Sequence, residues 1–358
     1  MNKRLKTILQ VIVFFGVGSI ILYFVYQRQN TLYQAKCAVD GIPAEDCSLL
    51  NKLWTDITGA NPWILLVVLV MFMVSNISRA IRWQMLLEPL GKKPRFLNSL
   101  MAIMAAYLAN LGVPRSGEFV RAGVISKYEG IPMEKAIGTV VTDRIIDVLS
   151  LLIVITLAFL LSFDYMYDYF QANFDIMSRL ERWIYNPLFI TGVIGVSIIS
   201  VGLVWYNWVR IISSALGKKV LGILKGFMDG IITVFKLKRP WVFLFHSIVI
   251  WFMYYLMTYV CFFAFEPTSH LSPVAGLVTF VFGSLGVVFP APGGMGSYQF
   301  LVMESLGFFG INSADAFSFS NIMFFSIQIF CNIFFGALAF IYLPIFNKRQ
   351  GTISRKED

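Results

Sequence analysis

Apolar and polar positions alternate along the chain in long blocks. A helix of about 20 apolar residues crosses the roughly 30 Å of hydrocarbon in a bilayer. Six blocks have this character, and each is expected to span a membrane: 8–26, 62–87, 136–162, 187–208, 241–265 and 318–346. The pattern predicts an all-α fold, a polytopic helical membrane protein with about six full spans.

The first block follows Lys3, Arg4 and Lys6, as the apolar core of a secretory signal would. Its length and the absence of a small-x-small cleavage site favour a retained span, with the N-terminus in the cytoplasm. A single transmembrane domain is expected over 1–346. It includes a polar outer loop at 27–61 and is followed by a basic cytoplasmic tail at 347–358.

Two further apolar blocks are interrupted by glycine and proline. Residues 97–114 are short and end in Gly-Val-Pro, whereas 271–312 contain a glycine-rich stretch that is broken by Pro290 and Pro292. Such blocks are typical of broken or re-entrant helices. A pair of them in two halves of a chain is typical of the central site of a transporter. Two ordinary spans with proline kinks are the alternative, and 271–312 has room for either two crossings or one hairpin.

Basic residues are concentrated on one side of this topology. Of the 29 lysines and arginines, 21 fall in segments assigned to the cytoplasm and five in segments assigned outside. This bias places both termini in the cytoplasm and accounts for the net charge of +9 without a nucleic-acid partner. The basic segment 209–240 has apolar residues every three or four positions. It predicts an amphipathic helix at the cytoplasmic interface, either bound to anionic lipid or simply anchored there.

Composition excludes several classes of protein. With 58% hydrophobic and 14% charged residues, the chain is too apolar for a soluble globular protein. Two isolated histidines and four cysteines offer no metal set, so neither a metal nor another cofactor is expected. Cys37 and Cys47 lie ten residues apart in the outer loop, where a structural disulfide is plausible.

The first candidate site motif, "GVPRSGEFVRA", follows the shorter interrupted block, from Gly112 to Ala122. A helix is expected to begin after Pro114, with Ser116 as its cap. Its N-terminus, together with Arg115 and Arg121, forms a site for an anionic group such as phosphate. Glu118 lies three residues from each arginine and can pair with either, as a gate would. A cytoplasmic loop held by a plain ion pair is the alternative.

The second motif, "TDRIIDVL", places Asp143, Arg144 and Asp147 inside a span. Ionisable groups there are costly, so they face a partner or a cavity. The economical pairs join Asp143 or Asp147 to Arg115 or Arg121, and Arg144 to Glu118. One carboxylate can instead titrate and couple transport to protons, and a purely structural network is equally compatible with the motif.

The third motif, "FPAPGGMGSYQ", contributes flexible backbone and no charge. Its glycines allow close approach of a ligand or a second helix, and exposed N–H groups can form an anion nest. Its side chains can donate hydrogen bonds. The candidate site residues in this motif are Pro290, Gly293, Gly294, Gly296 and Gln299.

In this order and spacing, the three motifs resemble the flippase-like membrane domain of the lysylphosphatidylglycerol synthases, over most of residues 60–345. In those two-part synthases the domain is associated with moving aminoacylated phosphatidylglycerol between leaflets, and a separate soluble domain makes the lipid. The chain stops at residue 358, so aminoacyl transfer is not expected. Family members often carry a glutamate where this chain has Gln299. If that carboxylate binds a cationic headgroup or a proton in the family, this chain lacks the group for that role.

The predicted function is therefore that of a lipid flippase or transporter of the inner (plasma) membrane, and not of an enzyme. An anionic headgroup enters a polar cavity between the interrupted segments while the acyl tails stay in lipid. The expected partner is a phospholipid or another anionic lipid, and assembly with further copies of the chain stays open. The alternatives are a glycosyltransferase using a polyprenyl-phosphate, with Asp143 or Glu118 as base or metal-binding group, and a non-transporting scaffold.

Overall fold

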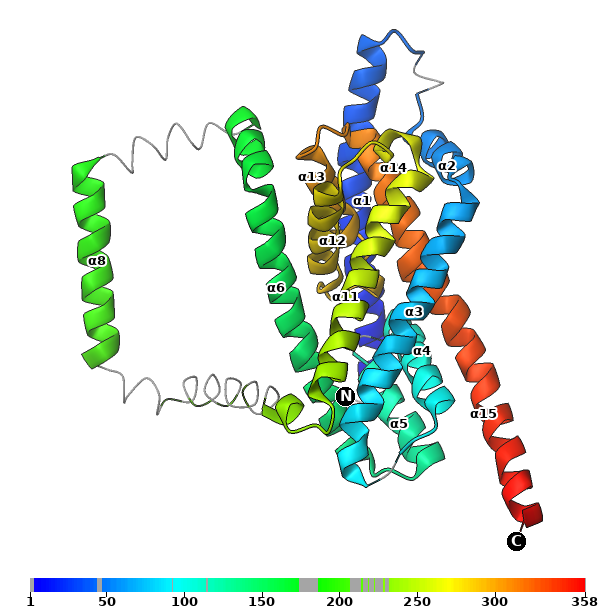
Figure 1. Ribbon diagram of the computed structural model, residues 1–358. Coiled ribbons are helices and arrows are strands. Elements are labelled where there is room, and N and C mark those ends of the chain that lie inside the picture. The colour runs from blue at the N-terminus through cyan, green and yellow to red at the C-terminus, as the bar shows by residue number, and fades with distance from the viewer. Residues whose placement is uncertain are drawn as a thin grey trace. The chain divides into compact units, whose positions relative to one another are not determined.

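The computed structural model describes residues 3–43, 47–91, 93–113, 115–173, 186–206 and 232–357, together with Ser214, Lys218, Gly222 and Met228. Every regular element in these residues is a helix, which confirms the all-α prediction (Figure 1). Most of the predicted amphipathic segment at 209–240 lies outside the described residues, as does Pro114.

The chain divides into two compact units. The first comprises Met1–Leu160 and Leu237–Asp358, and the second Leu161–Lys236. The second unit contains α8 (Pro187–Tyr206), a 20-residue apolar helix at the position of the expected span 187–208. All site features described below belong to the first unit.

Five helical stretches of the described chain are long and apolar enough to cross a membrane: Val11–Val39, Pro62–Leu90, Met133–Tyr167, Pro240–Phe262 and Ser313–Lys348. They correspond to five of the six spans predicted from the sequence. The elements that form them are α1 (Lys3–Val39), α3 (Pro62–Leu87), α6 (Met133–Asn173), α11 (Pro240–Cys261), α14 (Ser313–Met323), η5 (Phe324–Cys331) and α15 (Asn332–Glu357). Short 3-10 helices follow α3 and α11: η1 (Glu88–Leu90), η2 (Phe262–Ala264) and η3 (Glu266–Thr268).

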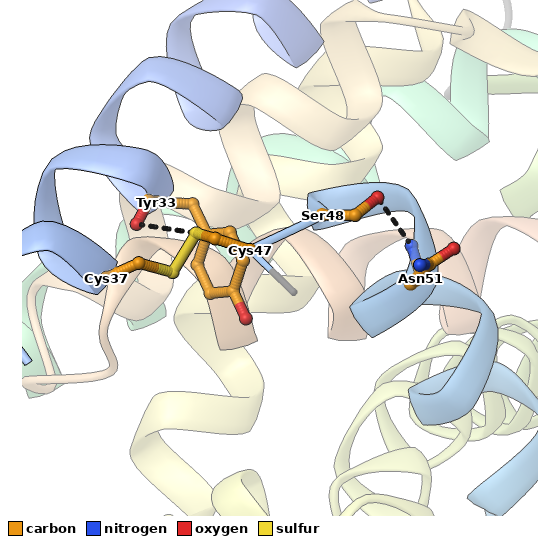
Figure 2. Close-up of a disulfide and its surroundings, with 5 residues drawn as sticks. All are labelled: Tyr33, Cys37, Cys47, Ser48 and Asn51. Atoms are coloured by element: carbon orange, nitrogen blue, oxygen red, sulfur yellow. Dashed lines mark hydrogen bonds between the residues drawn. A yellow bond between two sulfur atoms is a disulfide. The ribbon is translucent and has the colours of Figure 1, made fainter. Parts of the chain in front are cut away.

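The segment expected to be a polar loop at 27–61 is largely helical. Helix α1 continues to Val39 because residues 27–40 contain no glycine or proline, and polar side chains are compatible with a helix. Leu49–Gly59 then form α2, capped by Ser48, whose Oγ accepts from the Asn51 amide at 3.3 Å (Figure 2).

A disulfide joins Cys37 to Cys47 between α1 and α2, with the Cα atoms 6.2 Å apart, and confirms the predicted pairing (Figure 2). Lys52 of α2 forms an ion pair of 2.8 Å with Asp315 of α14. We call this end of the first unit the disulfide end. Both chain termini lie at the opposite end (Figure 1).

The first interrupted segment is a helical hairpin made of α4 (Phe96–Gly112) and α5 (Gly117–Glu129). Helices of 17 and 13 residues are about 25 and 20 Å long, which is less than the thickness of the hydrocarbon. The hairpin starts and finishes at the end of the unit opposite the disulfide (Figure 1). We call it the first hairpin.

The second interrupted segment is also a hairpin, made of α12 (Pro273–Val287) and α13 (Ser297–Gly307), with η4 (Pro292–Gly294) in its turn. Its helices, of 15 and 11 residues, are only about 22 and 16 Å long. The Ala264 carbonyl, shortly before α12, accepts a hydrogen bond of 2.9 Å from the amide of Asn61 at the start of α3. This second hairpin therefore enters from the disulfide end and is too short to cross twice.

Candidate functional site

The tip of the first hairpin is a tight turn between α4 and α5. A Cβ at Gly117 would lie 2.5 Å from a backbone oxygen of α4, so only glycine allows this approach. The Gly117 amide donates to Asn110 Oδ1 at 2.7 Å, which makes Asn110 the capping side chain. Ser116 precedes the helix, but its hydroxyl donates to two carbonyls at the end of α4, at 2.9 and 2.8 Å. The prediction that Ser116 caps α5 is wrong, because its backbone is already helical and turns the hydroxyl toward α4.

Two charged residues of this tip, Arg115 and Glu118, are exposed and partly exposed, respectively. Arg115 has a backbone φ of 58°, a left-handed conformation that is uncommon for a residue with a side chain. Its exposed guanidinium makes no ion pair with any residue in the described part of the chain. Glu118 pairs with Arg144 of α6 at 3.3 Å, as the sequence predicts, and both side chains are partly exposed.

A buried ionic cluster connects α3, α5 and α6. Arg82 lies 2.6 Å from Asp143 and 2.7 Å from Asp147, and Arg79 lies 2.7 Å from Asp147. Arg121 reaches Asp143 at 2.8 Å. Each of these five residues is at most 9% exposed. We call them the ionic cluster, and they attach α6 to the other two helices.

Sequence reasoning found only part of this cluster. The pairing of Arg121 with Asp143 agrees with the prediction, whereas Arg115 lies apart from both aspartates. Arg79 and Arg82 were not recognised, because arginines near the end of a predicted span fit the positive-inside bias. Their spacing of three residues, which puts both on one face of an apolar helix, is the signal that could have identified them.

Aromatic side chains surround the arginines. The Arg121 guanidinium carbon lies 3.8 Å from the centroid of the Trp83 ring, a cation–π contact. Arg79 donates to the Tyr254 hydroxyl at 3.2 Å, and this hydroxyl lies 3.3 Å from that of Tyr107. The tyrosines therefore extend the hydrogen-bonding network from α3 to α4 and α11.

The site carries more positive than negative charge. Three arginines and two aspartates leave the ionic cluster with one excess positive charge, and the groups beside it, Arg115, Arg144 and Glu118, add another. Within the described residues, Nε and Nη2 of Arg121 are buried and form no hydrogen bond, nor do the Nε atoms of the other two arginines. Asp143 Oδ1 and Glu118 Oε2 are likewise buried without a hydrogen bond, so the net charge, and not the unpartnered atoms, gives the site its positive character.

A cavity of about 820 Å³ lies beside the ionic cluster. Its charged lining consists of Arg79, Arg115, Glu118, Arg144 and Asp147. Residues from the tips of both hairpins, Leu111 and Gly293 among them, complete its wall, and a Cβ at Gly293 would lie 3.5 Å from the Leu111 side chain. The two interrupted segments therefore meet at a cavity of the size of a ligand pocket, which has a charged wall and apolar surroundings.

One part of the cavity rim is apolar and exposed. Val148 of α6 is 49% exposed, and Val288 and Phe289 at the end of α12 are 71% and 52% exposed. All three line the cavity. The charged wall of the cavity therefore lies beside an exposed apolar rim.

The glycines of the second tip provide close packing. Gly293, Gly294 and Gly296 have φ values of 59°, 77° and 86°. A Cβ at Gly294 would lie 2.6 Å from the Gly286 carbonyl oxygen across the hairpin. Of the candidate residues in this motif, only Pro290 and Gly293 line the cavity.

Gln299 is buried and holds the turn together. Its Oε1 accepts from the Gly296 amide at 2.8 Å, and the side chain is 1% exposed. The side chain is not part of the cavity lining. At this position the chain therefore uses an amide to cap the start of α13.

Helix α1 packs against the second tip. A Cβ at Gly18 would lie 3.0 Å from the Ala291 side chain, and a Cβ at Gly296 would lie 2.7 Å from Ile21. Phe14, one turn before Gly18, lines the cavity and is 6% exposed. This N-terminal helix therefore closes one side of the cavity.

Comparisons with known proteins agree with the motifs. A family model of the lysylphosphatidylglycerol synthase TM region matches residues 48–336. The UPF0104 membrane protein MJ1595 of Methanocaldococcus jannaschii is 32% identical over 102 residues, which cover 27% of this chain and 30% of that protein. The alignment thus spans less than a third of the relative's length. No solved structure matches the chain.

Proposed function

This chain belongs to the family of lysylphosphatidylglycerol synthase transmembrane regions, and on that premise we propose that it moves an anionic lipid between leaflets. The phosphate of the lipid lies beside Arg79, Arg115 and Arg144. The guanidinium of Arg115, which has no ion-pair partner among the described residues, can donate two parallel hydrogen bonds to it. The observation that carries the proposal is the cavity itself, whose lining holds more cationic than anionic side chains and includes residues from the tips of both hairpins.

The exposed apolar rim supports a lipid rather than a soluble anion as the substrate. A headgroup in the cavity leaves its acyl chains beside Val148, Val288 and Phe289, where they remain in hydrocarbon. A soluble anion has no acyl chains that could contact this apolar rim. Because the hairpin tips interrupt the bilayer from both sides, the headgroup has only a short distance to move through protein.

We place the protein in the inner (plasma) membrane with both termini in the cytoplasm. The excess of basic residues in the segments on that side supports this orientation. The disulfide, at the end opposite the termini, supports it independently, because disulfides persist in oxidising compartments (Figure 1). A Lys348→Cys variant tests the orientation: a membrane-impermeant thiol reagent should label it only in opened cells.

The central experiment measures translocation of fluorescent phosphatidylglycerol in proteoliposomes. The full chain should accelerate translocation, and Arg115→Gln should slow it at least roughly tenfold, since one charge-assisted contact is lost. Lys127→Gln, which neutralises an exposed cation of α5 outside the cavity lining, is the matched control and should leave the rate unchanged.

Two results would contradict the proposal. A folded protein that moves no anionic lipid would indicate a scaffold. Formation of a glycolipid from a labelled sugar donor and a polyprenyl-phosphate, by the purified chain alone, would identify a glycosyltransferase instead.

A further inference from the structure

The cavity has a second polar wall that carries no charge. Asn110 of α4, Gln328 of η5 and Asn332 of α15 all line the same space as the arginines. We call these three residues the amide wall. Polar side chains at this depth in a membrane protein are costly and normally face a partner or a cavity, so the presence of three amides on one cavity requires an explanation.

A π-helix brings two of these amides to the cavity. Met323 and Asn332 both line it, although they are nine residues apart. In a regular α-helix of 3.6 residues per turn, that separation would place them about 180° apart, on opposite faces. The π-helical hydrogen bonding of Phe324–Cys331 removes the offset and turns Asn332 toward the same side as Gln328. Short π-helical segments within α-helices are frequent at functional sites.

The amide wall has unused donors and acceptors of both kinds. Asn110 uses its oxygen to accept from Gly117, at 2.7 Å, and keeps its NH₂ group. Asn332 uses its NH₂ group to donate to the Gln328 carbonyl, at 2.8 Å, and keeps its oxygen. The Gln328 side chain is partly exposed to the cavity and offers both an oxygen and an NH₂ group. A ligand group that fits must therefore donate and accept hydrogen bonds, and a hydroxyl does both.

The charged lining disfavours an amine in the same place. The two carboxylates that line the cavity already have arginine partners: Asp147 lies 2.7 Å from Arg79, and Glu118 lies 3.3 Å from Arg144. An ammonium group would need one of these carboxylates or a free one. A quaternary ammonium neither donates nor accepts hydrogen bonds, so it would leave the amides unsatisfied.

We infer that the amide wall is a subsite for an uncharged, hydroxyl-bearing head, such as a glycerol, carried by the lipid whose phosphate is held by the arginines. The inference rests on the lipid-binding part of the proposed function and names the class of its substrate. The phosphate binds through charge, whereas the alcohol is selected by the matching donors and acceptors of Asn110, Gln328 and Asn332. A lipid phosphate without an alcohol head engages only the charged wall.

Binding to the detergent-purified full chain tests the subsite separately from transport. Affinity is measured from the rise in unfolding temperature on titration with dioleoyl phosphatidylglycerol or dioleoyl phosphatidic acid, which share a phosphate but differ in the alcohol head. Gln328→Leu and Asn332→Leu should each weaken binding of phosphatidylglycerol by roughly three- to tenfold, the value of one hydrogen bond. Binding of phosphatidic acid should change by less than roughly twofold.

Asn321→Leu is the matched control, because Asn321 is a buried amide just before η5 and lies outside the cavity lining. It should leave the relative affinity for the two lipids unchanged even if it lowers stability. The inference is overturned if the two leucine variants weaken the binding of both lipids equally or of neither. It is also overturned if the unmodified chain does not bind phosphatidylglycerol. Selective binding without any translocation would instead retain the subsite and reject transport.

Discussion

The two hairpins have a similar geometry but opposite chemistry. The first carries Arg115, Glu118 and Arg121 at and just after its tip, whereas no charged residue occurs in the second between Pro273 and Tyr298. The first tip is fixed by ion pairs to α6, and the second by backbone contacts that only glycine permits. One hairpin thus supplies the charge of the cavity and the other its shape, and the two should respond differently to substitution.

The largest loss of stability is expected from Asp143→Asn, which removes a carboxylate shared by arginines from two helices. Breaking a buried ion pair on one side costs about 3–5 kcal/mol, because the remaining charge is uncompensated. Thermal unfolding in detergent should register this loss. Asp164→Asn, at an exposed position of the same helix α6, is the control and should have little effect. A comparably stable Asp143→Asn protein would mean that α6 is held mainly by other contacts.

In the second hairpin the sensitive position is Gly294. Alanine there must adopt a left-handed backbone and would also meet the Gly286 carbonyl oxygen, so a loss of more than about 2 kcal/mol is expected. Gly310→Ala isolates the backbone contribution, because Gly310 has a similar φ of 78° and open space around its Cβ. It should cost about 1–2 kcal/mol. Equal unfolding temperatures for the two variants would argue against the packing role.

A smaller effect on stability, with a gain in lipid binding, is expected from Glu118→Gln at the first tip. The ion pair with Arg144 is partly exposed, so its removal should cost under about 1 kcal/mol. The released Arg144 guanidinium then becomes available to an anionic headgroup, and the affinity for phosphatidylglycerol should rise roughly two- to tenfold. Weaker binding in this variant would instead make Glu118 a direct ligand of the headgroup.

The smallest effect on stability is expected from Lys52, which joins α2 to α14 at the disulfide end. Burial lowers the pKa of Lys52, but hydrogen bonds and charge interactions with Asp315 and Asp56 outweigh it and raise the pKa above its usual value of 10.5. The stabilisation that the Lys52 interactions contribute is therefore complete below pH 10.5, and it is lost as the pH rises through the higher pKa of Lys52 in the folded protein. Between pH 9 and pH 12, Lys52→Met should lose less stability than the unmodified chain, by under about 1 kcal/mol.

Much of the fold was predictable because its signals are local. Apolar length identifies the spans, and the breaks at Gly112 and Pro290 identify the hairpins, since glycine and proline act on their own segment of backbone. The segment at 27–61 is largely helical and not the expected loop, because hydropathy indicates whether residues lie in the membrane and not whether they form a helix. Polar residues that lie beyond the bilayer can continue a helix as easily as end it, as α1 and α2 do.

The site was predictable only in part because its contacts depend on how helices are rotated. Few charges lie near the apolar segments, so the pair Arg144–Glu118 could be predicted, and Arg121–Asp143 was one of four combinations that the sequence left open. The positions of Arg79 and Arg82 depend on which face of α3 turns toward α6, which the sequence does not specify. The π-helix at Phe324–Cys331 gives no obvious sequence signal, so the amide wall could not be assembled before the structure.

The packing of α1 affects where the boundary of the domain should be drawn. The family match begins at residue 48, after the whole of α1. Yet this helix contributes Phe14 to the cavity wall and Ile21 to the space above Gly296. A chain shortened to the matched residues would lose that wall and expose the glycine turn to lipid. The residues matched by the family model are therefore fewer than the residues that form the folded domain and its cavity.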